Sequence, residues 1–167
     1  MNKYDTIASA AGSIPVKAPA APMQRARGAA RLSATHLDGR TRLARLYQQG
    51  SAKIRMPRSH HGSALDAVLI NTSGGLTGGD QMDWTIDLGQ NAKAIVTTQA
   101  CERIYRARAD AACINTNITL AEGAALSWLP QETILFDGGA FDRKLTVRLA
   151  PRASFLMVEP LIIGRTA

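Results

Sequence analysis

The segment INTNITL (Ile114–Leu120) alternates apolar and polar side chains along its length, and so does MDWTIDL (Met82–Leu88). Alternation with a period of two, rich in β-branched residues, is typical of a strand with one buried face. Further strand-like segments recur about every ten residues after Gly62, separated by Gly, Pro, Asn or Asp. The best candidate for a helical turn is Gln99–Ala109. We therefore expect an all-β fold with few short helices.

A phrase of strand, tight turn and Ala-led strand occurs three times. Ile86, Ile118 and Val147 occupy the same place in the three copies, at spacings of 32 and 29 residues. The Ala that follows is Ala92, Ala124 and Ala153 in turn. Units this short cannot bury an apolar face alone, so they are expected to stack. The repeat predicts stacked sheets with helical, solenoid-like winding; the alternative is the strand–turn–strand phrase of any antiparallel protein.

The segment NTSGGLTGGD (Asn71–Asp80) follows an apolar strand-like segment and contains four glycines, Gly74, Gly75, Gly78 and Gly79. Glycine permits positive φ angles and lets another backbone or a ligand come close. We therefore expect either a sharp bend or a close approach here. A phosphate-binding P-loop would carry a Lys where Asp80 stands, and a carboxylate repels phosphate, so nucleotide binding is not expected.

The N-terminal third is strongly basic, with eleven Lys/Arg and two acids in residues 1–58, although the whole chain carries only +7. Residues 1–27 are rich in Ala and Pro and are expected to form a disordered leader, followed by a β domain over 28–167. Leu43–Tyr47 and Ala52–Met56 resemble short strands. The basic arm could bind an acidic partner or simply be solvated; it lacks the interleaved aromatic residues of a base-stacking surface, which argues against nucleic acid.

Several other classes of site have weak support. Cys101 and Cys113 are too few for a disulfide scaffold and lack zinc-knuckle spacing. His60 and His61 are adjacent and would point to opposite faces of an extended segment, so loop residues are the simpler interpretation. No nucleophile elbow, membrane-length apolar segment or secretory signal occurs. We expect a cytoplasmic protein with no membrane association.

Four carboxylates attract attention because of where they fall. Asp80 closes the glycine-rich segment, and Glu102, Glu132 and Glu159 come at nearly equivalent corners of the three repeats. Stacked repeats would bring these acids together as an oxygen-rich lining suited to a hydrated divalent ion. Ordinary surface charge is the alternative.

Several segments together resemble one known family, the urease accessory protein UreD, also called UreH. They are Asn71–Asp80, Thr97–Gln99 with Tyr105 and Arg106, WLPQETILF (Trp128–Phe136) and LIIGR (Leu161–Arg165). The similarity runs in register from about Gly28 to Ala167. Any one of these segments alone would be unspecific, but the set is specific.

The resemblance implies a nickel-delivery chaperone rather than an enzyme. Members of this family have an all-β fold, bind UreF, which recruits the GTPase UreG, and dock on the urease apoprotein, with a possible dimer of complexes. The family subunit is thought to provide an internal route for Ni²⁺, with no permanently bound cofactor. Asp80, Glu132 and Glu159 match acidic positions of that route, and Glu102 is a further candidate. Gln81 stands where some members carry an acid.

Family members continue for about 100 residues beyond the point where this chain stops, so the resemblance implies a domain truncated at its C-terminus. Two other functions are open at this stage. One is a protein-interaction scaffold without ion contact, which uses its basic arm on an acidic partner. The other is a carbohydrate-active β-solenoid enzyme with Asp80 and Glu132 as an acid pair; the two Trp residues provide few sugar-stacking platforms.

Overall fold

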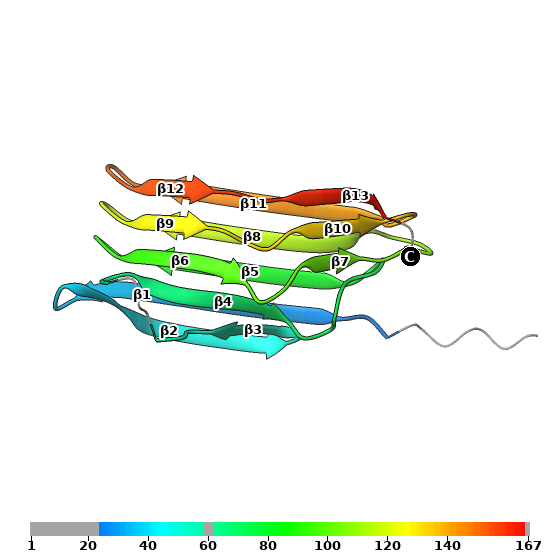
Figure 1. Ribbon diagram of the computed structural model, residues 1–167. Helices are drawn as coiled ribbons and strands as arrows, with labels where there is room; N and C mark the ends of the chain where they lie inside the picture. Colours follow the sequence, from blue (N-terminus) through cyan, green and yellow to red (C-terminus); the bar gives the residue numbers. More distant parts are fainter. Residues whose placement is uncertain (1–23, 59–61, 166–167) are drawn as a thin grey trace, which may run out of the picture.

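The computed structural model describes residues 24–58 and 62–165, and within these ranges it contains thirteen strands and no helix (Figure 1). The predicted leader therefore falls mostly outside the described residues, as do His60 and His61. The strands are β1 (Arg27–Leu37), β2 (Arg40–Gly50), β3 (Ala52–Arg55), β4 (Leu65–Asn71), β5 (Gln81–Leu88), β6 (Lys93–Thr98), β7 (Glu102–Ile104), β8 (Ala112–Leu120), β9 (Ala125–Trp128), β10 (Thr133–Phe136), β11 (Phe141–Leu149), β12 (Ser154–Met157) and β13 (Leu161–Arg165). The all-β prediction is confirmed.

The strands form three sheets that run along the same stack. The sheet orders are β11-β8-β5-β1-β2, β12-β9-β6-β4-β3 and β13-β10-β7. Pairing is parallel throughout except for β1 with β2 and β3 with β4, which are antiparallel. Figure 1 shows the strands as successive rungs, with β1–β4 at one end and β11–β13 at the other.

Residues 81–104, 112–136 and 141–165 each contribute one strand to each sheet, and we call these segments coils 1, 2 and 3. Ile118 of coil 2 pairs with Ile86 of coil 1 and with Val147 of coil 3. The spacings of 32 and 29 residues are therefore the register of a parallel stack. This confirms solenoid-like winding and rules out an antiparallel meander as the source of the repeat.

The core lies between the sheets and is built from the inward-facing half of each alternating strand. Met82, Ile86 and Ile118 are fully buried, and so are Ala92 and Ala124 after the turns that leave the first sheet. Burying one large aliphatic side chain contributes roughly 1.5–3 kcal/mol before ordering entropy is subtracted. Because this core has few aromatic residues, it depends on many such aliphatic contacts.

The expected helical turn over Gln99–Ala109 is wrong. Its centre is strand β7, which pairs in parallel with β10, and Ile104 is fully buried. Backbone pairing with the next coil and burial of Ile104 outweigh a weak local preference, because propensity yields to tertiary context. Within the described residues no helix is present that could cross a membrane.

Candidate functional site

The glycine-rich loop between β4 and β5 packs directly against coil 1. Leu76 donates its amide hydrogen to the Arg103 carbonyl (2.7 Å) and accepts from the Tyr105 amide (2.8 Å), which adds one rung to the third sheet. A Cβ on Gly75, whose φ is +141°, would lie 2.6 Å from the Tyr105 ring. The segment is thus both sharply bent and closely approached by protein, so the two expectations for it are met together.

Asp80 closes this loop as a buried carboxylate, only 5% exposed. Its Oδ1 accepts from the Ala26 amide and its Oδ2 from the Thr77 amide, both at 2.8 Å. The Ala26 carbonyl in turn accepts from the Gln81 amide (2.9 Å). Both carboxylate oxygens of Asp80 therefore accept hydrogen bonds from backbone amides, and these bonds connect the residue before β1 to the glycine-rich loop.

A cavity of about 180 Å³ lies inside the stack, lined by residues from all three sheets. It is large enough for several water molecules, each of which takes roughly 30 Å³ in the liquid. Its polar lining includes Asn71, Thr98, Glu102, Thr116, Thr133 and Arg143. Exposed Gln99 and Gln131 also line it, so the cavity reaches solvent at the corners after β6 and β9.

Two buried polar atoms of this lining have no hydrogen-bond partner within the described residues, the Thr116 hydroxyl and Arg143 Nε. Thr116 is only 1% exposed. Buried polar groups almost always have a partner, which is protein, water or an ion. The cavity therefore offers unpaired polar groups to water or to a polar ligand.

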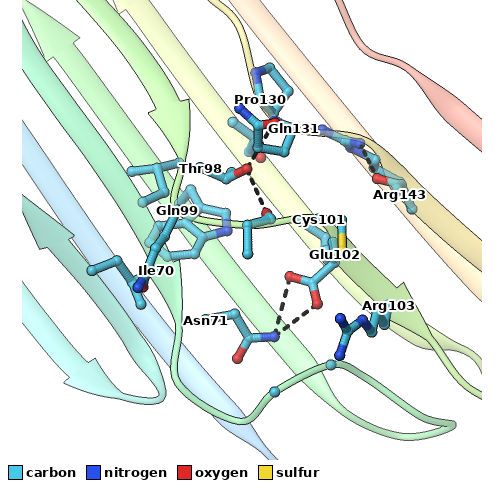
Figure 2. A pocket seen from close by; sticks show the side chains of 18 of the residues that line it. Ile70, Asn71, Thr98, Gln99, Cys101, Glu102, Arg103, Pro130, Gln131 and Arg143 are labelled. Atoms are coloured by element: carbon cyan, nitrogen blue, oxygen red, sulfur yellow. Dashed lines mark hydrogen bonds between the residues drawn. The ribbon is translucent and has the colours of Figure 1, made fainter.

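Glu102 is the only carboxylate among the residues that line the cavity. Both of its oxygens accept from the Asn71 amide, at 3.0 and 3.2 Å, as Figure 2 shows. Burial raises the pKa of Glu102, and this outweighs the opposite effects of the Asn71 and Arg103 hydrogen bonds and of the Arg143 charge. The carboxylate is thus poorly solvated, and an added cation would compensate its charge.

This raised pKa makes stability fall with rising pH. Between the ordinary value of 4.5 and the raised folded pKa, the native state binds more protons than the unfolded chain. The free energy of unfolding should therefore decrease as pH rises through that window and stay lowered above it. Glu102→Gln should remove this part of the slope and be the more stable protein above the window, as measured by urea unfolding across pH. Glu122→Gln, a surface variant, should keep the wild-type slope; equal slopes for all three proteins would contradict the assignment.

Arg143 and Glu159 form an ion pair beside the cavity, with side chains only 23% and 20% exposed. Trp128 Nε1 also donates to the same Glu159 oxygen (2.6 Å). Arg143 Nη1 lies 3.4 Å from the Thr133 hydroxyl. Glu159 is thus held by two donors and touches the cavity lining without itself being part of it.

The four predicted carboxylates are not brought together. Glu102 lies in the cavity, Glu159 is paired with Arg143, and both oxygens of Asp80 accept from backbone amides. The Glu132 carbonyl accepts from the Glu102 amide (3.0 Å), and within the described part of the chain the Glu132 carboxylate has no ion pair. Among residues 24–58 and 62–165 no cluster of three or more His, Cys, Asp or Glu side chains could hold a metal ion. The pairing explains why, because Thr133 aligns with Glu102 and with Leu161. Corners of different length place the acids out of register.

Three site residues were missed by reasoning from the sequence: Arg143, Thr116 and Asn71. Arg143 had a signal, because it stands in the apolar phase of the alternation over Phe141–Leu149. Cys101 was expected to be a small core residue, yet it lines the cavity as a free thiol, and Cys113 is free as well. Neither Asp80 nor Glu132 lines this cavity, so it contains no such acid pair for cleaving a sugar.

Comparison with known proteins identifies the family. The sequence model of the UreD urease accessory protein matches residues 26–167. This chain belongs to the UreD family. Similar curated proteins, each named urease accessory protein UreD, come from Chelativorans sp. strain BNC1 (56% identical over 147 residues, 88% of this chain) and Rhizobium rhizogenes strain K84 (56% over 144 residues, 86% of this chain). Brucella anthropi UreD 1 is 54% identical over 144 residues, also 86% of this chain.

This UreD family member spans about half the length of the curated relatives that it matches. The aligned region covers 53%, 52% and 50% of the three proteins named above. The matched half contains the glycine loop, the interior cavity and all three coils. Each of these features therefore lies within residues 26–167, the part of the chain that the family model matches.

Proposed function

We propose that this chain acts in urease maturation as a nickel-delivery chaperone, together with UreF, UreG and the urease apoprotein, in the cytoplasm. The observation that best supports the proposal is the polar cavity inside the stack, with Glu102 in its wall. Membership of an accessory family fits a role in handing on cargo rather than in turning over a substrate. Nickel is the cargo in this proposal, bound only in transit.

The cavity offers ligands that a transition-metal ion accepts. They are the Glu102 carboxylate, the side-chain oxygens of Asn71, Thr98 and Thr133, and the Cys101 thiol, with water to complete the shell. With one carboxylate and no cluster of strong ligands among the described residues, binding is expected to be weak. Weak binding suits the role, because a carrier must release what it binds.

The proposal can be tested with the two tryptophans of the chain, Trp84 and Trp128, because both line the cavity. Ni²⁺ quenches indole fluorescence at close range. We expect saturable quenching of the wild-type chain, a loss of at least about tenfold in apparent affinity in Glu102→Gln, and no change in Glu122→Gln. At limiting nickel, Glu102→Gln should also lower the nickel content of urease matured with UreF and UreG.

The scaffold without ion contact is the second candidate, and a specific feature favours it. The β1–β3 end of the stack carries exposed Arg27, Arg31, Arg40, Arg42, Arg45 and Arg55, with ion pairs only from Arg31 to Asp87 and from Arg42 to Asp38 among the described residues. Such an end attracts an acidic partner. Under this candidate, Glu102→Gln would bind nickel and support urease loading like the wild type, and that result would overturn nickel delivery through the cavity.

A further inference from the structure

Arg143 stands at a position that the other coils fill with apolar side chains. In the first sheet it aligns with Ile114, which aligns with Met82. Met82 is fully buried and Ile114 is 7% exposed. A guanidinium at such an interior position is costly unless its charge is compensated. Its presence therefore calls for an explanation that packing alone does not provide.

The contacts of Arg143 compensate its charge but leave it incompletely held. One terminal nitrogen pairs with Glu159 and the other makes a long contact to Thr133, while Nε has no partner within the described residues. Glu159, by contrast, is independently fixed by the Trp128 indole. If the guanidinium moved away, the Glu159 carboxylate would stay in place.

Arg143 also lies in the wall of the cavity that contains Glu102, as Figure 2 shows. The guanidinium thus interacts with two carboxylates. It forms an ion pair with Glu159, and its charge acts electrostatically on Glu102 in the same cavity wall. A second cation placed in this space would be repelled by Arg143 and attracted by both acids.

We propose that Arg143 is the resident cation of the cavity and that a divalent metal ion binds by displacing it from Glu159. This inference rests on the proposed nickel function and adds a basis for selectivity. The tethered guanidinium competes as an intramolecular ligand at high effective concentration. A monovalent ion such as K⁺ gains no more attraction from a carboxylate than the guanidinium does, whereas a divalent ion gains twice that attraction from Glu102 in the cavity wall and from Glu159 beside it.

The test removes the charge of Arg143 and keeps a donor toward Glu159. Arg143→Gln should bind Ni²⁺ about tenfold more tightly than the wild type by tryptophan quenching, because one repulsive charge is lost. Arg143→Lys retains the charge and should stay within about twofold. Arg152→Met is the matched control, since Arg152 pairs with Glu122 at 2.7 Å on the surface of the same coil. An Arg143→Gln affinity equal to or weaker than wild type would overturn the proposal.

A second measurement on the wild type stands even if Arg143→Gln does not fold. Phenylglyoxal modifies accessible guanidinium groups, and mass spectrometry locates the modified residues. Saturating Ni²⁺ should increase modification of Arg143 at least about threefold and leave Arg152 unchanged, because displacement from Glu159 exposes the group. Unchanged modification of Arg143, in protein whose fluorescence is quenched, would overturn displacement. Absence of saturable quenching in both wild type and Arg143→Gln would instead refute nickel binding in the cavity.

Discussion

Asp80→Ala should lower the free energy of unfolding by about 2–5 kcal/mol, because it removes a buried carboxylate and leaves two partly buried amide donors without an acceptor. The donors are the amides of Ala26 and Thr77, which lie 2.8 Å from the two carboxylate oxygens. Losing them loosens the entry of β1 and the closure of the glycine loop together. Urea unfolding followed by circular dichroism measures the loss as a shift in midpoint.

Asp87→Ala is the control for this experiment. Asp87 lies in β5, the strand that follows Asp80, and pairs with Arg31 at 3.8 Å on the surface, where an ion pair is worth only about 0–1 kcal/mol. Asp80→Asn should fall between the two, because its amide can accept one of the two hydrogen bonds. If Asp80→Ala and Asp87→Ala unfolded at the same midpoint, the backbone-anchoring role of Asp80 would be refuted.

This role changes how Asp80 can be used to study nickel. A loss of urease activation in Asp80→Ala would follow from a damaged fold whether or not the residue meets an ion. Glu102 is the better probe, because its carboxylate lies in the cavity and, among the described residues, Asn71 is the one side chain that donates to it. Glutamine at that position keeps the shape and an acceptor for Asn71 while it removes the charge.

The coiled architecture could be predicted because one physical rule produced it. Parallel strands that pair in register place their inward-facing residues side by side. The number of residues from Ile86 to Ile118, and from Ile118 to Val147, is therefore the length of chain that makes one turn of the coil. Alternation then assigned the buried face correctly for β5 and β8. These features depend on averages over many side chains, and single exceptions do not disturb them.

The site was harder to predict because it depends on those exceptions. The three corner acids appear equivalent when they are counted from the preceding strands, yet Glu102 aligns with Thr133 rather than with Glu132. Corner lengths are set by local turns, which periodicity does not describe. Arg143 breaks the apolar phase of β11, and only the structure shows that the break opens into a cavity with Glu102.

The glycine loop combines both situations, since a bend or a close approach was expected there and the residues that approach it were not. Gly78 approaches a segment 31 residues later: a Cβ there would lie 2.2 Å from the Ala109 carbonyl oxygen and 2.6 Å from that of Asp110. Neither neighbour is a flexible side chain, so neither can yield without moving the backbone. This close approach is what the second Gly-Gly pair makes possible.

Gly78→Ala should therefore destabilise the protein by about 3 kcal/mol, the upper part of the usual range for an overpacked site. Moving the backbone apart would also weaken the Gly79 amide bond to Ala111 (3.0 Å) and the Thr77 hydroxyl bond to Arg106 (2.8 Å). The measurement is the urea midpoint, together with proteolysis between β7 and β8, which should become faster.

Gly74→Ala separates this steric effect from the general cost of replacing a loop glycine. Gly74 has a φ of +79° but nothing within 4 Å of an added Cβ, so the substitution should cost only about 1 kcal/mol of left-handed strain. A Gly78→Ala loss no larger than that of Gly74→Ala would mean that the loop does not press on residues 109–110. In that case the glycines would be needed only for the bend of the chain. The packing of the loop against its neighbours would then be looser than the backbone hydrogen bonds of Leu76 and Gly79 require.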